Sequence, residues 1–288
     1  MSLCKDGKVS VFCYITALVV SSLPQILLLC GFDPFSNGIF HNVWILHVFQ
    51  FIVLNILILF PFRGFTYQVA IRSTFLGYVF GAGILVLLLA PASWQCFGIY
   101  MAVMATFHYS EFLSIAWTNP SAISIDSFIL QHSVPYVVAA CVSWIEFLVE
   151  HHFYPSLKEL SIISYIGLAI CVSGEALRKI AMFTAKQNFN HIIQTEKSTD
   201  HKLITHGVYR FCRHPSYVGW FYWSIGTQLI LKNPICLLAY AVASWSFFHD
   251  RILIEEITLL TFFGEAYVEY QKKVGTGLPF ISGYRISL

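Results

Sequence analysis

Residues 216–249 read SYVGWFYWSIGTQLILKNPICLLAYAVASWSFFH. The run is almost entirely apolar or aromatic and is broken only once by a charge and a proline, at Lys232-Asn233-Pro234. This pattern predicts a tight helical hairpin with limbs of about 16 residues each. A full membrane span takes about 20 residues, so a re-entrant pair of helices is the alternative.

The composition of the whole chain predicts an integral membrane protein. Of its 288 residues, 57% are hydrophobic and only 11% charged, with a mean hydropathy of +0.68. A soluble domain carries about 25% charged residues. Together with the hairpin, six further apolar runs predict an all-α protein with about eight transmembrane helices. These runs cover residues 11–30, 43–61, 72–90, 94–113, 130–149 and 160–180. The net charge of +2, without a basic tract, gives no indication of nucleic-acid binding.

The lysines and arginines predict the orientation in the membrane. Lys5 and Lys8 precede the first run as in a signal peptide, but no convincing cleavage site follows, so we expect a retained first helix. With eight crossings, fifteen of the 17 basic residues fall on the side of the termini, and only Lys158 and Lys232 fall opposite. Cytosolic loops carry the excess of lysine and arginine. Both termini are therefore predicted to be cytosolic.

The cysteines and histidines do not indicate a metal site. The eight cysteines form no CxxC pair and most lie within apolar runs, which argues against zinc and against a disulfide framework. His201, His206 and His214 lie close in sequence, but their spacing matches no di-iron histidine box. We expect no metal.

The polar residues concentrate in two segments that flank the hairpin. The connection over 181–215 and the tail after 250 are both predicted to be cytosolic, and polar groups at a membrane edge are often functional. We therefore expect a cytosol-facing site within a functional core of residues 131–288. Residues 1–130 are expected to be scaffold and lipid contact.

The tail contains a pair of opposite charges on one helix face. Arg251 and Glu255 are four residues apart, and Glu256, Tyr267 and Tyr270 are expected to follow on the same helix. A guanidinium can hold a carboxylate at two points, and a carboxylate one turn away can hold an ammonium group.

The connection adds a dense set of polar and aromatic groups, including Gln194, Tyr209 and Tyr217, and Pro215 suits the first turn of the next helix. The chain has neither a phosphate-binding P-loop nor a GxGxxG motif after a strand. These residues alone leave open a reductase, a methyltransferase and a non-enzymatic receptor.

Four short motifs carry a resemblance to a known family. HGVYRFCRHPSYVGW begins at residue 206, RILIEE at 251, FGEAYVEY at 263 and LPFI at 278. In this combination the chain resembles the isoprenylcysteine carboxyl methyltransferases through about residues 185–282. The RHPxYxG element alone is shared with membrane phospholipid methyltransferases, and a related RHxNY element occurs in sterol reductases.

The resemblance implies a membrane enzyme of the endoplasmic reticulum that methylates the C-terminal carboxylate of prenylated cysteine. It implies S-adenosylmethionine as methyl donor and farnesylated or geranylgeranylated small GTPases and lamins as partners. Arg251 would hold the substrate carboxylate, and Arg251 and Glu255 would be the catalytic residues. The implied cofactor-binding residues are Gln194, His201, Lys202, Leu203, Ile204, Tyr209, His214, Pro215, Ser216, Tyr217 and Glu255. An NADPH-dependent sterol-reductase-like enzyme, a phospholipid N-methyltransferase and a non-enzymatic prenyl-binding protein are the alternatives.

Overall fold

The computed structural model describes residues 2–29, 43–130, 133–197, 199 and 201–285, and these residues contain helices but no β-strand. They form two compact units. The first unit comprises Met1–His132 and Tyr154–Leu160, and the second comprises Ser133–Phe153 and Ser161–Leu288.

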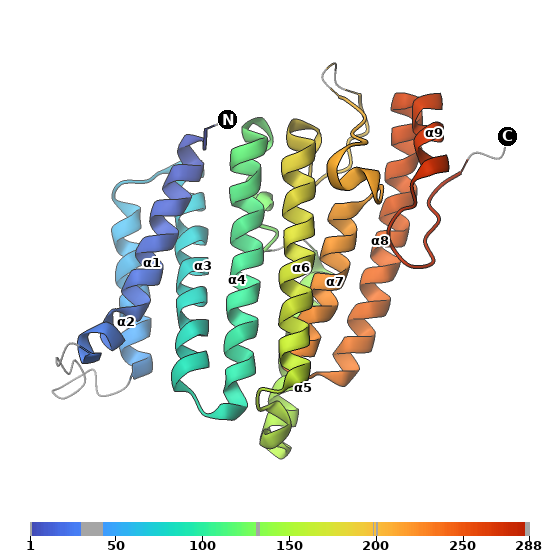
Figure 1. Ribbon diagram of the computed structural model, residues 1–288. Helices are drawn as coiled ribbons and strands as arrows, with labels where there is room; N and C mark the ends of the chain where they lie inside the picture. The colour runs from blue at the N-terminus through green and yellow to red at the C-terminus, as the bar shows by residue number, and fades with distance from the viewer. Residues whose placement is uncertain (1, 30–42, 131–132, 198, 200, 286–288) are drawn as a thin grey trace. The chain divides into compact units, whose positions relative to one another are not determined.

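The first unit is built around one central helix. Its helices are α1 (Lys5–Leu29), α2 (Val43–Leu59), α3 (Gly64–Leu89) and α4 (Ala92–Thr118), followed by the short turns η1 (Pro120–Ala122), η2 (Ile125–Phe128) and η3 (Pro155–Lys158). Helix α3 packs against both α1 and α4 (Figure 1). Gly83 and Gly98 let α3 and α4 approach closely, because a Cβ at Gly83 would lie 2.7 Å from the carbonyl oxygen of Gly98.

The second unit contains the predicted hairpin. Its elements are α5 (Val134–Phe153), α6 (Ile162–Ala185), η4 (Lys186–Asn188), η5 (Gly207–Arg210), α7 (Pro215–Leu231), α8 (Pro234–Phe263) and α9 (Glu265–Lys273). Within this unit, the connection from α6 to α7 lies at the same end as α9 (Figure 1). The two polar segments of the sequence therefore meet at one end of the helices.

Glycines hold α6 and α7 together along their length. A Cβ at Gly174 would lie 2.5 Å from the carbonyl oxygen of Gly219, and one at Gly226 would lie 2.7 Å from the Cys171 Sγ atom. Real Cβ atoms do not approach so closely, so the two backbones touch where only glycine fits. Small residues that allow such contact are typical of helix pairs in membranes.

The hairpin turn is fastened to α5 by buried polar side chains. Lys232 adopts a left-handed conformation with φ of 54°, which ends α7. The Asn233 Nδ2 atom donates to the carbonyl oxygen of Ser143 over 2.9 Å. The Glu146 carboxylate accepts from the backbone N–H groups of Ile235 and Cys236, each over 2.7 Å, and so caps the first turn of α8.

The sequence prediction of two short limbs is wrong for the second limb. Helix α7 has 17 residues, but α8 has 30 and continues through Arg251 and Glu255 to Phe263. Gly264 then ends the helix with φ of 53°. Tyr267 and Tyr270 consequently lie on a separate helix, α9, and not on the helix of Arg251 as expected.

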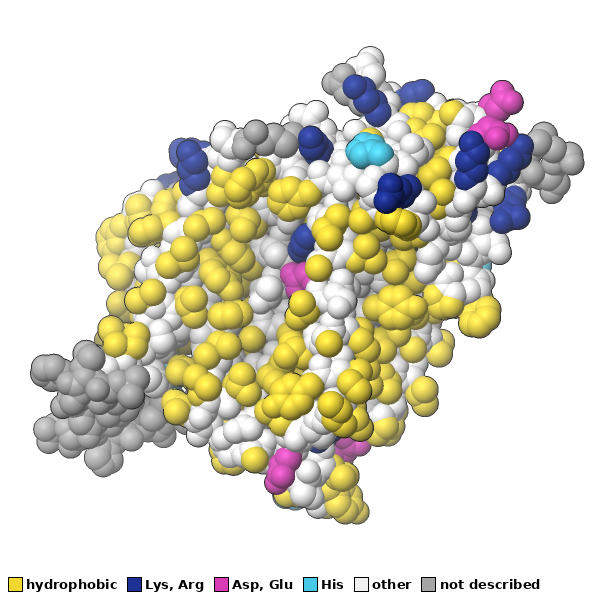
Figure 2. All heavy atoms as spheres, viewed as in Figure 1, with side chains coloured by type: hydrophobic (Ala, Val, Ile, Leu, Met, Phe, Trp, Pro, Cys, Tyr) yellow, Lys and Arg dark blue, Asp and Glu magenta, His cyan; other side chains and the backbone are white. Residues whose placement is uncertain are grey.

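Four described stretches are long and apolar enough to cross a membrane: Lys5–Ile26, Gly64–Leu89, Val134–Phe153 and Pro155–Asn188. Each of the eight predicted apolar segments contains a helix, α1 to α8, but the count of eight crossings remains a prediction. Hydrophobic side chains cover much of the surface in view (Figure 2). A surface of this kind suits an environment of lipid.

Candidate functional site

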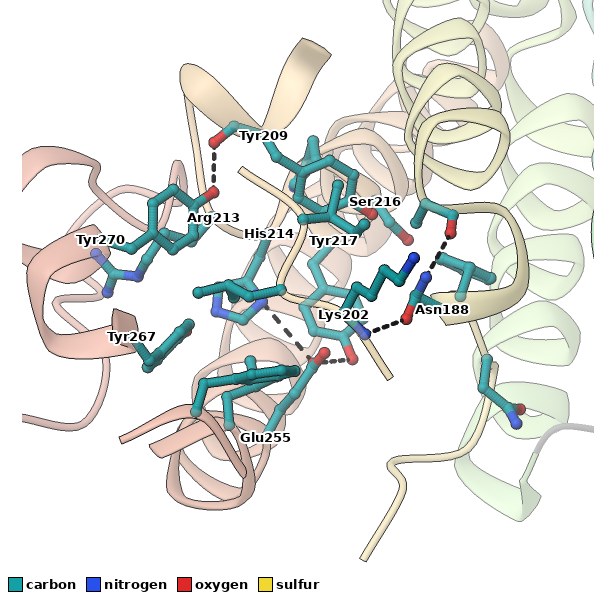
Figure 3. Close-up of a pocket in the computed structure, with 18 residues that line it drawn as sticks. Asn188, Lys202, Tyr209, Arg213, His214, Ser216, Tyr217, Glu255, Tyr267 and Tyr270 are labelled. Carbon is teal, nitrogen blue, oxygen red and sulfur yellow. Dashed lines mark hydrogen bonds and ion pairs between the residues drawn. The ribbon is translucent and has the colours of Figure 1, made fainter. Parts of the chain in front are cut away.

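Two adjoining cavities open where the α6–α7 connection meets the C-terminal half of α8. Their volumes are about 120 and 90 Å³, and both are lined by Lys202, Tyr217 and Glu255. Figure 3 shows the residues that line the first cavity. The first is also lined by residues 203–204, 209 and 213–217 and by α9, and the second by residues 192–194 and 201. The cavities thus bring together the two polar segments that the sequence singled out.

The Tyr217 hydroxyl connects the two charges on α8. It accepts a hydrogen bond from the Arg251 Nε atom over 2.9 Å and donates one to the Glu255 Oε2 atom over 2.5 Å. Arg251 also donates to the carbonyl oxygen of His191. Tyr217 therefore holds the guanidinium and the carboxylate in fixed positions at the edge of the cavities.

Glu256, next to Glu255, is fully buried and has a different role. Its Oε1 atom accepts from the Arg213 Nε atom over 2.8 Å, from the His214 Nε2 atom over 3.1 Å and from the Tyr267 hydroxyl over 3.1 Å. A buried carboxylate is stable only when it is paired and fully hydrogen-bonded, as it is here. This cluster joins α7, α8 and α9.

The chain after α9 closes over the same carboxylate. The backbone N–H of Tyr284 donates to the Glu256 Oε2 atom over 2.7 Å, and the Gln271 Nε2 atom donates to it over 3.1 Å. Arg213 donates to the carbonyl oxygens of Val274 and Ser282. Residues 274–284 are thereby attached to the back wall of the first cavity.

The start of α7 is held by a buried arginine on α6. The Arg178 Nη1 atom donates to the Ser216 Oγ atom over 2.6 Å, and its guanidinium lies 4.8 Å from the Trp220 ring centroid. Arg178 is 2% exposed, so these contacts replace water around its charge. Pro215 is the first residue of α7, as the sequence predicted.

The connection supplies the remaining walls. The backbone N–H of Lys202 donates to the Asn188 Oδ1 atom over 2.7 Å, and the Tyr270 hydroxyl donates to the carbonyl oxygen of Tyr209. Burial, with a smaller contribution from the charge of Glu255, raises the pKa of Tyr209 well above its usual value. Tyr209 therefore offers a neutral ring to the cavity throughout the physiological pH range.

All eleven positions expected to bind the cofactor line one or both cavities. Lys202, Tyr217 and Glu255 line both, and Gln194 and His201 line the second. The first cavity is lined by the other six, which are Leu203, Ile204, Tyr209, His214, Pro215 and Ser216. Arg251 lines neither cavity but contacts Tyr217 at their edge. Their roles in binding remain predictions.

Sequence reasoning missed several wall residues. Asn188 lines both cavities, and Arg213 lines the first. Tyr267 and Tyr270, which also line the first, were noted only for their place in the tail. Glu256 was noted only for its place in the helix. The sequence does contain a signal for the Arg213–Glu256 pair. RILIEE has a second carboxylate, at Glu256, and RHPSY begins with an arginine, Arg213, that could pair with it. Among the described residues, no group of three or more His, Cys, Asp or Glu side chains is arranged to hold a metal ion.

Comparison with known proteins gives a consistent result. A model of the isoprenylcysteine carboxyl methyltransferase (ICMT) family matches residues 166–261. A protein-S-isoprenylcysteine O-methyltransferase of Tribolium castaneum is 57% identical over 227 residues, which cover 79% of this chain and 81% of that protein. The protein of the same name from Xenopus laevis is 50% identical over 99% of this chain and 98% of its own length. The human protein of that name is 56% identical over 82% of each.

A solved structure agrees over the whole length. The eukaryotic intramembrane Ras methyltransferase ICMT superimposes with a TM-score of 0.92 at 48% identity, covering 98% of this chain and all of that one. Identity at this level, over nearly complete chains, shows common descent and a common fold. The chain therefore belongs to the isoprenylcysteine carboxyl methyltransferase family.

Proposed function

We propose that the protein transfers a methyl group from S-adenosylmethionine to the C-terminal carboxylate of a prenylated cysteine and so forms a methyl ester. Membership of the family supports methylation of isoprenylcysteine. The observation that carries the assignment of the site is the Tyr217 hydroxyl, which joins Arg251 to Glu255 at the edge of both cavities.

The chemistry of the walls fits S-adenosylmethionine. Its sulfonium or adenine suits the ring of Tyr209, and its ammonium suits Glu255, whose side chain is 29% exposed. When bound, the cofactor supplies an electrophilic methyl group. The two cavities together are smaller than the usual ligand pocket of about 300–1,000 Å³. We therefore expect the side chains around their openings to move apart on binding.

Arg251 is the group expected to hold the acceptor. A C-terminal carboxylate has an ordinary pKa of about 3.5 and is already ionised at pH 7, so the reaction needs no general base. Arginine has five N–H donors, and Tyr217 and His191 engage two of them. The others can hold a carboxylate and aim one oxygen at the methyl group.

Exclusion of water is the second task of the site. Attack of a carboxylate on a sulfonium cancels two opposite charges, and a site poor in water favours that cancellation. The apolar side chains of Leu259 and Phe263 line both cavities beside Glu255. A location at the membrane edge would let the cofactor enter from the cytosol and the prenyl chain from the bilayer.

The same proposal includes the setting of the enzyme. We infer a multi-pass protein of the endoplasmic reticulum with eight crossings and with both termini and the site in the cytosol. The distribution of lysine and arginine supports this orientation. The expected clients are small GTPases and lamins that end in a prenylated cysteine, and residues 1–130 are expected to serve as scaffold.

Methyl transfer from labelled S-adenosylmethionine to N-acetyl-S-farnesylcysteine in detergent or liposomes tests the proposal. Binding of NADPH in place of S-adenosylmethionine would favour the sterol-reductase alternative. Methylation of a phospholipid amine would favour the phospholipid N-methyltransferase, in which Arg251 would be poorly placed because an amine acceptor needs no cation beside it. Prenyl binding without turnover would favour a non-enzymatic protein.

A further inference from the structure

The first unit contains a large cavity that shares no residue with the candidate site. Its volume is about 800 Å³, and its walls come from α1, α2, α3 and α4. A volume of this size is typical of a pocket for a whole small molecule. Val48, Phe75 and Leu89 lie in its wall and are 60%, 44% and 66% exposed, so the cavity opens at the surface of the molecule.

The wall of this cavity selects an uncharged, largely apolar occupant. None of the described residues that line it is Asp, Glu, Lys or Arg. A phosphate-bearing headgroup would therefore be buried without a counter-charge, which is costly. Phe51, Phe75, Trp94 and Phe97 give the cavity a largely aromatic wall.

A small polar group on the wall defines where the polar end of an occupant would lie. The Tyr78 hydroxyl donates to the carbonyl oxygen of His47 over 2.8 Å, and the His47 Nδ1 atom lies 2.9 Å from the same hydroxyl. Gln25, on the neighbouring helix α1, also lines the cavity. Its side-chain oxygen is buried and has no hydrogen-bond partner among the described residues.

An unpaired buried acceptor is uncommon, because it loses water without gaining a partner. A hydroxyl group on an occupant would supply the missing donor once the Gln25 amide turns toward the cavity that the residue lines. The wall therefore favours an occupant that is neutral and mainly apolar, that packs against aromatic side chains, and that carries one hydroxyl donor. A rigid ring system loses less conformational entropy on binding than two flexible acyl chains, which favours a sterol over a diacyl lipid.

We propose that this cavity is a binding site for a membrane sterol, with the sterol hydroxyl donating to the Gln25 side-chain oxygen and the ring system lying against the aromatic wall. The sterol would enter through the opening beside Val48 and Phe75. The site does not depend on the proposed function, since all of its residues lie in the first unit.

Photolabelling of the full-length protein tests this proposal. The purified protein in lipid nanodiscs is labelled with a photoactivatable, clickable cholesterol analogue, and labelled peptides are mapped by mass spectrometry. We expect saturable labelling within residues 47–101 that unlabelled cholesterol displaces. Epicholesterol, in which the hydroxyl points the other way, should displace it less well.

Four variants make the assignment specific. Ala82→Phe fills the cavity from its wall and should abolish the saturable labelling, and Val48→Trp should obstruct the opening from an exposed position that tolerates a large side chain. Gln25→Leu removes the acceptor and should weaken binding about fivefold, which corresponds to about 1 kcal/mol. Gln68→Leu is the matched control, because Gln68 is exposed and bonds to Arg72 outside the cavity.

Thermal unfolding in detergent, measured on the same samples, shows whether each variant is folded. Two results would overturn the proposal: saturable labelling that persists in both folded Ala82→Phe and Val48→Trp, or displacement by diacylglycerol as effective as by cholesterol. Failure of methyl transfer in the wild-type protein would bear only on the proposed function, since the labelling is read independently of turnover.

Discussion

The Arg213 Nε atom lies 2.8 Å from the Glu256 Oε1 atom, and the side chains of both residues are at least 99% buried. Arg213 immediately precedes α7 and Glu256 lies in the C-terminal half of α8. The ion pair therefore joins the two limbs of the hairpin at the end away from their turn. His214, Tyr267, Gln271 and the backbone of Tyr284 bond to the same carboxylate. The pair is the structural support of the first cavity.

Replacing Glu256 with alanine should destabilise the protein strongly. The change leaves Arg213 buried without its counter-charge, and breaking a buried pair in this way costs about 3–5 kcal/mol. Thermal unfolding in detergent should show a midpoint lower by roughly 10 °C. Glu269→Ala is the control, because its ion pair with Lys272 is exposed. Equal midpoints for the two variants would contradict the supporting role of Glu256.

The packing of α6 on α7 should not tolerate a methyl group at Gly174. A Cβ there would lie 2.5 Å from the Gly219 carbonyl oxygen, so the helices must separate. We expect Gly174→Ala to lower the unfolding midpoint by several degrees, as overpacking typically costs about 1–3 kcal/mol. Gly275→Ala, which meets no atom within 4 Å, should be neutral. A Gly174→Ala protein as stable as Gly275→Ala would refute the close approach.

Arg251→Lys should lose most of the activity although it keeps the charge. A planar guanidinium can grip a carboxylate at two points and bond to Tyr217 at the same time, and an ammonium cannot. The loss in kcat/KM should be about 5- to 150-fold, or about 1–3 kcal/mol. Arg210→Lys, whose guanidinium lies over Phe211, is the control. Near-normal turnover of Arg251→Lys would mean that Arg251 does not hold the substrate.

Glu255→Gln should weaken cofactor binding more than prenyl-substrate binding. Glutamine keeps an oxygen for the Tyr217 hydroxyl but removes the charge expected to face the ammonium group. Calorimetry with S-adenosylhomocysteine should show an affinity lower by about tenfold or more, while Glu269→Gln binds normally. If the affinity is unchanged, Glu255 belongs to the framework of the site and not to its ligand contacts.

The elements that could be predicted from the sequence are the helices whose apolar composition is required by the lipid environment. Long apolar runs placed α1 to α8, and the break at Lys232-Asn233-Pro234 placed the hairpin turn, because a membrane helix must be apolar over most of its length. The end of α8 could not be predicted in this way. Its uninterrupted apolar stretch stops near residue 249, but the helix continues to Phe263. Glu256 on this continuation is buried and bonds to Gln271 of α9 and to the backbone of Tyr284.

The candidate site shows the same limit. Arg251 and Glu255 were expected on one helix face because helical spacing is local, and the structure places them there. Glu256, by contrast, contacts residues 213, 271 and 284, which lie up to 43 positions away from it in the sequence. Such pairs depend on how the chain returns after α9, which no local pattern specifies.

The proposed orientation can be tested by thiol labelling in sealed microsomes. In a background without Cys141 and other accessible cysteines, Lys197→Cys should react with an impermeant reagent from outside, and Ser156→Cys only after the vesicles are opened. Lys197 and Ser156 lie in the connections predicted to face the cytosol and the lumen. The opposite pattern would place the cofactor cavities in the lumen and overturn the proposed topology.

The most direct test of the account compares methyl transfer to three acceptors: N-acetyl-S-farnesylcysteine, its C-terminal amide and unprenylated N-acetylcysteine. The amide should bind without being methylated, because it lacks the anionic oxygen that Arg251 would aim. The unprenylated acid should be a poor substrate even at high concentration, because each buried CH₂ of the lipid contributes about 0.8 kcal/mol. We predict efficient transfer from labelled S-adenosylmethionine to the farnesylated acid alone. Equally efficient methylation of N-acetylcysteine would contradict the account.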